Sequence, residues 1–213
     1  MRLRYVAVIF LLFIISASAT TKAQTGDPLN SRVTLVVNRA TIHKLLGILS
    51  LQTSVPIGFE ETTAGDGSGA KLIDIAIRRE SLKHALNAIV RADNRYEWAT
   101  VDGVINVLPK QREQCICDVV LSNFSVRDLP LGDVGFAIME TPEIKAKMTE
   151  LGLIDTHFKE RGDDPPLRAK IAISRTNSTV REILNNLLKA GYVRYWAIVR
   201  YGDAKEYIAI VVS

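Results

Sequence analysis

The sequence predicts an α+β protein built from two tandem small modules, in each of which two helices pack on one face of a small mixed β-sheet. Segments typical of short strands alternate with segments in which apolar residues recur at the spacing of a helix face. The stretch IAIRRESLKHALNAIVRADNRYEW at 75–98 is echoed by IAISRTNSTVREILNNLLKAGYVRYW at 171–196. A pattern of strand, helix and aromatic residues that occurs twice predicts one structural unit used twice.

The front of the first half predicts strand, helix and strand. Residues 34–37 (TLVV) are rich in β-branched side chains and predict a strand. Thr41 is a suitable N-cap for the helix that follows. Pro56 disfavours helical backbone at the residue before it and therefore ends that helix, ahead of a short strand at 56–59. The apolar face of the helix consists of Ile42, Leu45, Leu46 and Leu49.

The back of the first half predicts strand, helix and hairpin. Residues 61–70 are rich in glycine and small polar residues and predict a loop. The adjacent carboxylates Glu60 and Glu61, where this loop begins, are expected to be solvated. A strand is predicted at 72–77. Asp102-Gly103 between two apolar runs is a strong signal for a two-residue hairpin turn within 95–109. The apolar face of the intervening helix consists of Leu82, Ala85, Leu86, Ile89 and Val90.

The second half repeats this back portion closely. Residues 170–174 predict a strand, and Thr179 with Glu182 forms a capping box at the start of a helix. Asn185 and Trp196 take the places of Asn87 and Trp98, and a hairpin with a Gly-Asp turn is predicted at 195–212. The apolar face of this helix consists of Val180, Ile183, Leu184, Leu187 and Leu188.

The front of the second half follows the pattern more loosely. Residues 119–139 can be aligned with 33–50, with Pro130 at a helix start, where proline is tolerated. Residues 141–154 predict an added helix capped by Thr141, and 159–169 a polar loop.

These patterns predict a first module at 30–109, a polar linker at 110–116 and a second module at 117–213. Each helix has a single apolar stripe, so it must pack on a sheet whose other face stays in water or meets a partner.

The N-terminus predicts a signal peptide at 1–23, cleaved after Ala19 or Ala23. Arg2 and Arg4 precede an apolar run of about 11 residues, which small residues follow. That run is too short for a membrane-spanning helix, which needs about 20 residues. An uncleaved N-terminal anchor is the alternative, and no stable membrane span is expected after cleavage.

Export changes the charge of the chain. The formal net charge of +4 falls to +1 when Arg2, Arg4 and Lys22 are removed by cleavage after Ala23, and to +2 after Ala19. A nearly neutral chain lacks the density of basic residues that neutralises phosphates, so no nucleic-acid partner is expected.

The two cysteines, Cys115 and Cys117, leave three readings open: reduced thiols, a strained bridge between them, or an intermolecular disulfide. Metal binding needs more than two ligands, and none lies nearby in the sequence. His43, His84 and His157 belong to no metal or catalytic motif. The prediction is therefore a protein that is not an enzyme and has no cofactor, unless a catalytic set assembles across the two halves.

The first half resembles the short N-terminal (STN) domain of secretins and TonB-dependent receptors. The resemblance rests on LLGILSLQTSVPIGF, on SLKHALNAIV and on YEW followed by DGVINVLP, and it covers about 75 residues well. The back of the second half, about 45 residues, is similar more faintly. The resemblance implies a periplasmic or secreted module that acts by contact with envelope proteins. Because no barrel or secretin core follows, no channel or transport role is expected.

Five aromatic residues are candidate partner contacts: Trp98, Tyr195, Trp196, Tyr201 and Tyr207. Each tryptophan either completes the core, with its N–H bonded to a carbonyl, or anchors a partner. Contact is expected by strand addition at an exposed sheet edge or by docking on the helix-free sheet face. The alternative is a periplasmic small-ligand-binding protein with its site between the two modules.

Overall fold

The computed structural model describes residues 27–62, 71–155, 165–201 and 207–213. The predicted signal peptide, most of the glycine-rich loop, His157 and the Gly-Asp turn lie outside these residues. Among the helices of the described residues, none combines the length and the apolar character that a membrane crossing requires.

The described chain alternates strands and helices, which confirms the predicted α+β class. The first half contains β1 (Arg32–Ala40), α1 (Ile42–Thr53), β2 (Ile57–Glu60), β3 (Ile73–Ser81), α2 (Leu82–Ala92), β4 (Tyr96–Val101) and β5 (Val104–Pro109). The second half contains β6 (Val120–Pro130), α3 (Val134–Met139), α4 (Pro142–Leu151), β7 (Ile154–Asp155), β8 (Lys170–Thr179), α5 (Val180–Lys189), β9 (Tyr195–Tyr201) and β10 (Tyr207–Val212). Short 3-10 helices lie at Pro28–Asn30, Arg112–Gln114, Leu131–Asp133 and Pro165–Arg168.

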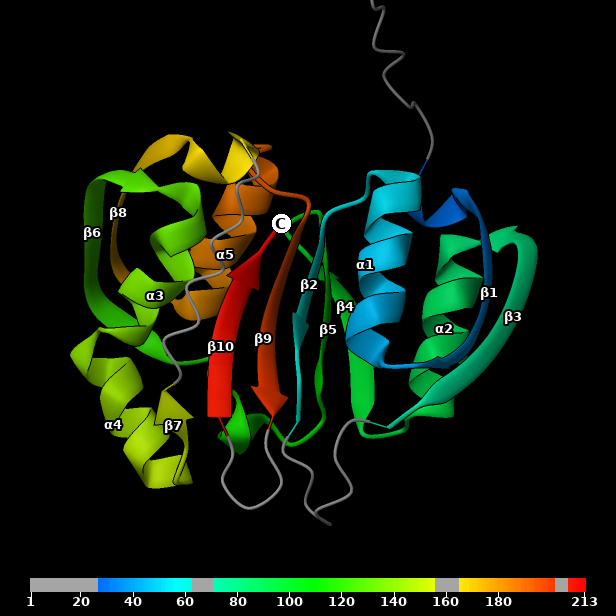
Figure 1. The fold of residues 1–213 in the computed structure, drawn as a ribbon, viewed down its shortest axis with the longest axis horizontal. Helices are drawn as coiled ribbons and strands as arrows, with labels where there is room; N and C mark the ends of the chain where they lie inside the picture. Colours follow the sequence, from blue (N-terminus) through cyan, green and yellow to red (C-terminus); the bar gives the residue numbers. More distant parts are fainter. Residues whose placement is uncertain (1–26, 63–70, 156–164, 202–206) are drawn as a thin grey trace, which may run out of the picture.

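A single six-stranded sheet in the order β4-β5-β2-β9-β10-β7 forms the centre of the molecule (Figure 1). β4 and β5 form one antiparallel hairpin, and β9 and β10 form another. β2 is parallel to β5 on one side and to β9 on the other, and β7 is parallel to β10. Strands from the two halves of the sequence therefore belong to one sheet.

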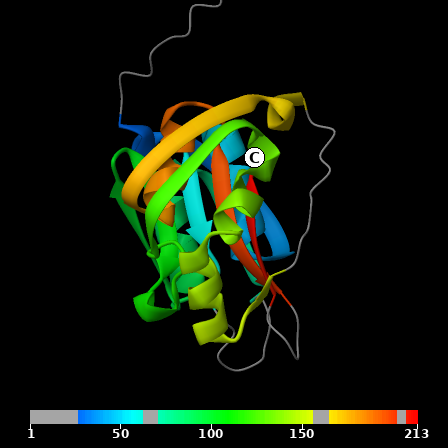
Figure 2. The same cartoon turned by 90° about the vertical axis from the view of Figure 1, so that its left-hand side faces the viewer.

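Helices cover both faces of this sheet, and a two-stranded antiparallel ribbon lies outside each helical layer. The ribbons are β1–β3 beside α1 and α2, and β6–β8 beside α3 and α5. Figure 2 shows the β6–β8 ribbon curving across the second half. Successive residues of a strand point to opposite faces. Accordingly Ile105 and Ala197 belong to the first-half core, whereas Val104 and Trp196 belong to the second-half core.

The central sheet corrects the expected module surfaces. We expected each half to have its own sheet with one helix-free face, but the face turned away from the helices of one half is covered by the other half. All six residues of β5 are buried as a result. The strand pairing between β2 and β9 joins residues more than a hundred positions apart, and no local pattern in the sequence indicates it.

The predicted linker at 110–116 is also only partly correct. Its beginning contains a partly exposed 3-10 helix, but Cys115 is 2% exposed and Ile116 is fully buried in the second-half core. The end of this segment therefore belongs to the packed structure.

Local signals in the sequence fix the helix starts. Thr41, Ser81 and Thr179 cap α1, α2 and α5, and the capping box of Thr179 with Glu182 is present. Two residues before each cap lies a non-glycine residue with positive φ; these are Arg39 (52°), Arg79 (53°) and Asn177 (48°). At two of these positions a side chain on the neighbouring strand accepts a hydrogen bond from the backbone N–H. Asp74 accepts from Arg39, and Thr34 accepts from Arg79.

Gly58 on β2 provides a test of the β2–β9 pairing. Gly58 lies opposite Trp196 on β9, and a Cβ at this position would overlap the indole ring. We expect Gly58→Ala to lower the free energy of unfolding by about 1–3 kcal/mol, because the packed indole must move. Urea unfolding followed by circular dichroism measures the change.

Gly47 in α1 is the matched control, because a Cβ there meets nothing within 4 Å. We expect Gly47→Ala to raise the free energy of unfolding by about 0.5–1 kcal/mol, as alanine does in a helix interior. Equal effects of the two substitutions would contradict a close contact between Gly58 and Trp196.

Candidate functional site

The two predicted tryptophans occupy related positions but differ in burial. Trp196 is fully buried and donates its indole N–H to Oδ1 of Asn185 at 2.9 Å. Trp98 is half-buried and donates to Oδ1 of Asn87, also at 2.9 Å. Each N–H is thus bonded to a side-chain carbonyl. Trp196 offers no surface to a partner, which corrects its place among the candidate contacts, whereas Trp98 keeps some exposure.

Tyr195 joins the two halves and is not exposed either. It is 5% exposed, and its hydroxyl lies 2.9 Å from Nδ1 of His43 on α1. Burial raises the pKa of Tyr195 well above its ordinary value and lowers the pKa of His43. Tyr201 and Tyr207 are opposite one another in the β9–β10 hairpin, and their side chains lie outside the description. The five candidates therefore form no single aromatic surface among the described side chains.

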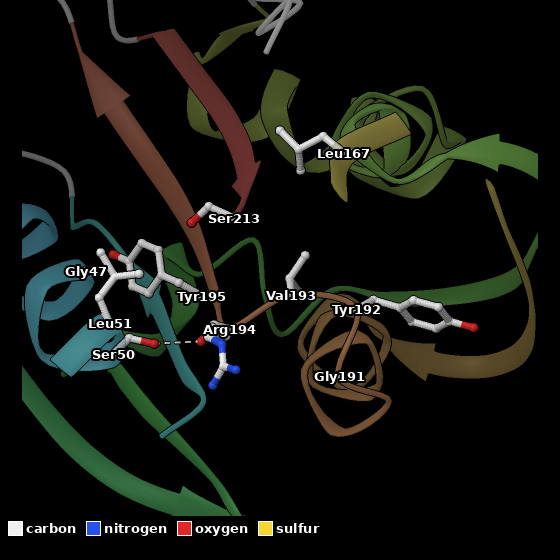
Figure 3. A pocket seen from close by; sticks show the side chains of 10 residues that line it. All are labelled: Gly47, Ser50, Leu51, Leu167, Gly191, Tyr192, Val193, Arg194, Tyr195 and Ser213. Carbon is white, nitrogen blue, oxygen red and sulfur yellow. Dashed lines mark hydrogen bonds between the residues drawn. The ribbon is translucent and has the colours of Figure 1, made fainter. Parts of the chain in front are cut away.

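A pocket of about 450 Å³ lies between the two halves. Figure 3 shows Gly47, Ser50 and Leu51 of α1 facing the turn that leads from α5 into β9. Leu51 is 75% exposed and Tyr192 on that turn is 49% exposed. The Ser50 hydroxyl is hydrogen-bonded to the carbonyl oxygens of Val55 at 3.0 Å and Arg194 at 2.8 Å, which fixes this wall. Most of the atoms that line the pocket are apolar.

The outer edge of β4 is a second candidate surface. Within the described residues β4 is the first strand of the central sheet, and no strand pairs with its outer edge. Lys110 donates its N–H to the carbonyl of Arg95 at 2.9 Å, so the backbone groups of Arg95 point towards the β5 side. In an antiparallel pair every second residue points its backbone groups towards the partner strand. The backbone groups of Trp98 and Thr100 therefore point away from β5. The side chains at 99–101 are exposed. With respect to the described part of the chain, this edge presents backbone donors and acceptors that no neighbouring strand pairs.

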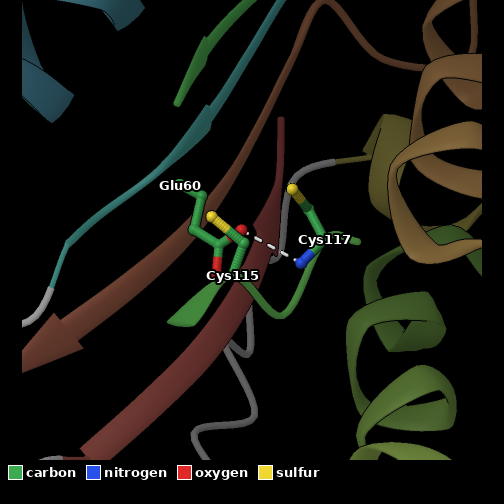
Figure 4. A group of neighbouring side chains, drawn as sticks. All are labelled: Glu60, Cys115 and Cys117. Atoms are coloured by element: carbon green, nitrogen blue, oxygen red, sulfur yellow. Dashed lines mark hydrogen bonds between the residues drawn. The ribbon is translucent and has the colours of Figure 1, made fainter. Parts of the chain in front are cut away.

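A buried polar cluster lies where the two halves meet, on the second-half face of β2 (Figure 4). Glu60 is fully buried, although the sequence analysis placed it in a solvated loop. Its Oε1 accepts from the N–H of Ile116 at 2.5 Å and its Oε2 from that of Cys117 at 3.0 Å. Arg200, which is 8% exposed, lies 3.8 Å from Oε1. Burial raises the pKa of Glu60 above its ordinary value, against the opposing effect of these partners.

Cys115 and Cys117 complete this cluster. Both are free and buried, and their Sγ atoms lie within 4.8 Å of one another and of a carboxylate oxygen of Glu60. The pKa of the Cys117 thiol is raised by a hydrogen bond with Cys115, by burial and by Glu60. Because neither sulfur reaches the surface, an intermolecular disulfide does not fit this arrangement. Glu60 was missed from the sequence because it is distant from both cysteines along the chain.

Comparisons with known proteins add no family to these observations: a scan against protein-family models, a search of curated proteins and a search of solved structures each find no match.

His43 supplies a pH-dependent test of the contact between the halves. Because burial lowers its pKa, the unfolded chain binds more protons than the folded chain below about pH 6.5, the ordinary imidazole value. We therefore expect the free energy of unfolding to fall as the pH is lowered through that value towards the folded-state pKa. Urea unfolding at a series of pH values measures the slope.

His43→Asn keeps an acceptor near the Tyr195 hydroxyl without a titrating group, and should flatten the slope in this window. His84 is exposed, so His84→Asn is the control and should leave the slope as in the parent chain. An unchanged slope in His43→Asn would contradict the assignment.

Proposed function

We propose that this chain is an exported, non-enzymatic protein-interaction module of the cell envelope, related to the STN domain of secretins and TonB-dependent receptors. It acts in the periplasm or outside the cell, by contact with envelope proteins, and it contains two copies of one α+β module.

The strand arrangement supports the duplication. In the first half, β4 and β5 form a hairpin and β2 is parallel to β5. In the second half, β9 and β10 form a hairpin and β7 is parallel to β10. Each half also has a ribbon outside its helices. The central sheet is thus two three-stranded units, β4-β5-β2 and β9-β10-β7, placed end to end.

Side-chain contacts support the same correspondence. The Asn87–Trp98 and Asn185–Trp196 hydrogen bonds have the same length of 2.9 Å and the same separation of 11 residues. Each links the last α-helix of its half to the first strand of the hairpin. An aligned pair of polar and aromatic residues with one shared role is more specific than a shared apolar pattern.

The observation that carries the proposed function is the pairing of β2 with β9. Four residues of β2, from Ile57 to Glu60, are opposite Tyr195 to Ile198 in parallel orientation. Strand addition between modules therefore already occurs inside this chain. In the duplication β4 corresponds to β9, and within the described residues the outer edge of β4 has no strand partner. We assign this edge as the surface that accepts a strand of an envelope protein.

The test combines crosslinking with a backbone substitution. A photoreactive residue at Val101 on β4 should capture one recurring envelope protein in living cells. Thr100→Pro removes a backbone N–H that points away from β5, so capture should be lost. Proline is tolerated at edge strands, so the fold should persist. Mass spectrometry identifies the captured protein, and circular dichroism checks the fold.

Thr100→Ala is the matched control, because it changes the same side chain but keeps the N–H. Capture should persist in this variant. Equal capture from Thr100→Pro and the parent chain, or no capture from Val101 in abundant exported protein, would overturn strand addition at β4.

The pocket favours a second candidate function, the binding of a small apolar ligand between the halves. It has the size and the mainly apolar lining of ligand sites. Gly47 lines it and has open space beside it, so Gly47→Leu should fill the pocket without disturbing the core. We expect a metabolite that raises the melting temperature of the parent chain to lose this effect in Gly47→Leu. No stabilising metabolite, or an equal effect in both, would contradict this candidate.

A further inference from the structure

The buried cluster at the meeting point of the halves has the composition of a metal site. Glu60 comes from the end of β2, and Cys115 and Cys117 come from the segment between the 3-10 helix at Arg112–Gln114 and β6. We propose that Glu60, Cys115 and Cys117 bind one thiophilic divalent cation of the Zn²⁺ class. This inference is independent of the proposed function, because it concerns neither the β4 edge nor the pocket.

The donor atoms are already close to coordinating distance. One donor atom from each of the three residues lies within 4.8 Å of the others. Zinc–sulfur and zinc–oxygen bonds of about 2.3 Å and 2.0–2.2 Å place neighbouring donors of a tetrahedral site about 3.5–3.8 Å apart. Shifts on the order of 1 Å, shared among three side chains, bring the donors together.

The backbone fixes the carboxylate to the segment that carries both thiols. Glu60 accepts the N–H groups of Ile116 and Cys117, so its position is set relative to both neighbouring cysteines. Figure 4 shows the bond to Cys117. A carboxylate oxygen that accepts one hydrogen bond has a further lone pair for a cation. Such hydrogen bonds to a ligand's carboxylate hold it in place as metal sites require.

The charges balance when a divalent cation is bound. Two thiolates and one carboxylate carry three negative charges, which the cation and the guanidinium of Arg200, 3.8 Å from Glu60, neutralise. Binding replaces the two thiol protons, which leave to solvent, with two metal–sulfur bonds, and no electron is transferred. A buried group with zero net charge avoids the desolvation cost of isolated ions.

The donor set selects the class of cation. Thiolates favour zinc and other thiophilic metals over magnesium and calcium, which prefer oxygen ligands. Three protein ligands leave a fourth position for water or for a group supplied by the surrounding chain. Because Glu60 comes from β2 of the first half and both cysteines pack in the second-half core, a bound cation ties the two halves together and stabilises the folded chain.

The test uses the reduced full-length chain and cadmium ion as a spectroscopic probe. Titration with Cd²⁺ should produce the ultraviolet absorption of cadmium–thiolate bonds and saturate at one equivalent. An excess of Zn²⁺ should displace the probe. We expect Cys115→Ser and Cys117→Ser each to weaken the affinity at least tenfold, and Glu60→Gln to weaken it measurably.

Circular dichroism without metal shows whether each variant folds. The serine variants are nearly isosteric, so they keep the test decisive if Glu60→Gln fails to fold. Glu97→Gln is the control, because Glu97 is an exposed carboxylate on β4, and its affinity should equal that of the parent chain.

Three results would overturn the site. The first is the absence of cadmium–thiolate absorption in the reduced chain. The second is an affinity unchanged in either serine variant or in a folded Glu60→Gln variant. The third concerns a chain purified without reductant. It is a mass two hydrogens lower, which shows a Cys115–Cys117 disulfide, together with no cation binding after that disulfide is reduced.

Discussion

The parallel pairing of β2 with β9 is the contact on which the rest of the structure depends. It turns two three-stranded units into one sheet, and so it places helices of different halves on opposite faces. Strands buried on both faces are mostly apolar in both side-chain directions. β5 follows this rule except at the buried Asn106, whose side-chain amide donates to the carbonyl of Val104. Where polar or small residues occur on β2, each therefore has a particular partner: Gly58 makes room for Trp196, and Glu60 accepts two N–H groups.

Glu60 illustrates how a charge can be accommodated at such a position. Removing a carboxylate from water is costly, and the attraction of Arg200 at 3.8 Å is only part of the compensation. Hydrogen bonds from Ile116 and Cys117 supply a further part, and burial still holds the pKa of Glu60 above its ordinary value. The same hydrogen bonds connect the end of β2 with the segment between the halves, so the polar cluster and the β2–β9 pairing reinforce one another. A hydrophobic residue at this position could fill the space but could not satisfy those two N–H groups.

The sequence predicted the elements and missed their assembly. Helix faces, the Thr179 capping box and the Asp102-Gly103 turn, whose residues have φ of 51° and 80°, depend on neighbours within a few positions. Such features can be recognised from short local patterns of residues. The β2–β9 pairing, the burial of Glu60 and the contact of His43 with Tyr195 depend on residues from separate halves. Hydrophobic spacing does not indicate strand order. A ligand site between the two modules was one expectation, but the residues that line the pocket and form the polar cluster could not be predicted, and Tyr195 was wrongly expected at the surface.

The proposed duplication also explains why the two ends of the central sheet differ. β4 is antiparallel to its counterpart β9, and the helices of the two halves lie on opposite faces, so a half-turn about an axis in the sheet relates the units. Because that half-turn is combined with a shift across the strands, the contact joins unlike edges and leaves one accepting and one donating edge at the ends of the sheet. The donating edge is β7, which in the described residues has only two residues, whereas β2 has four. Very short edge strands resist pairing. Among the described residues, the accepting edge at β4 is therefore open and the described part of its natural complement on a second copy is short, which favours a partner other than the chain itself.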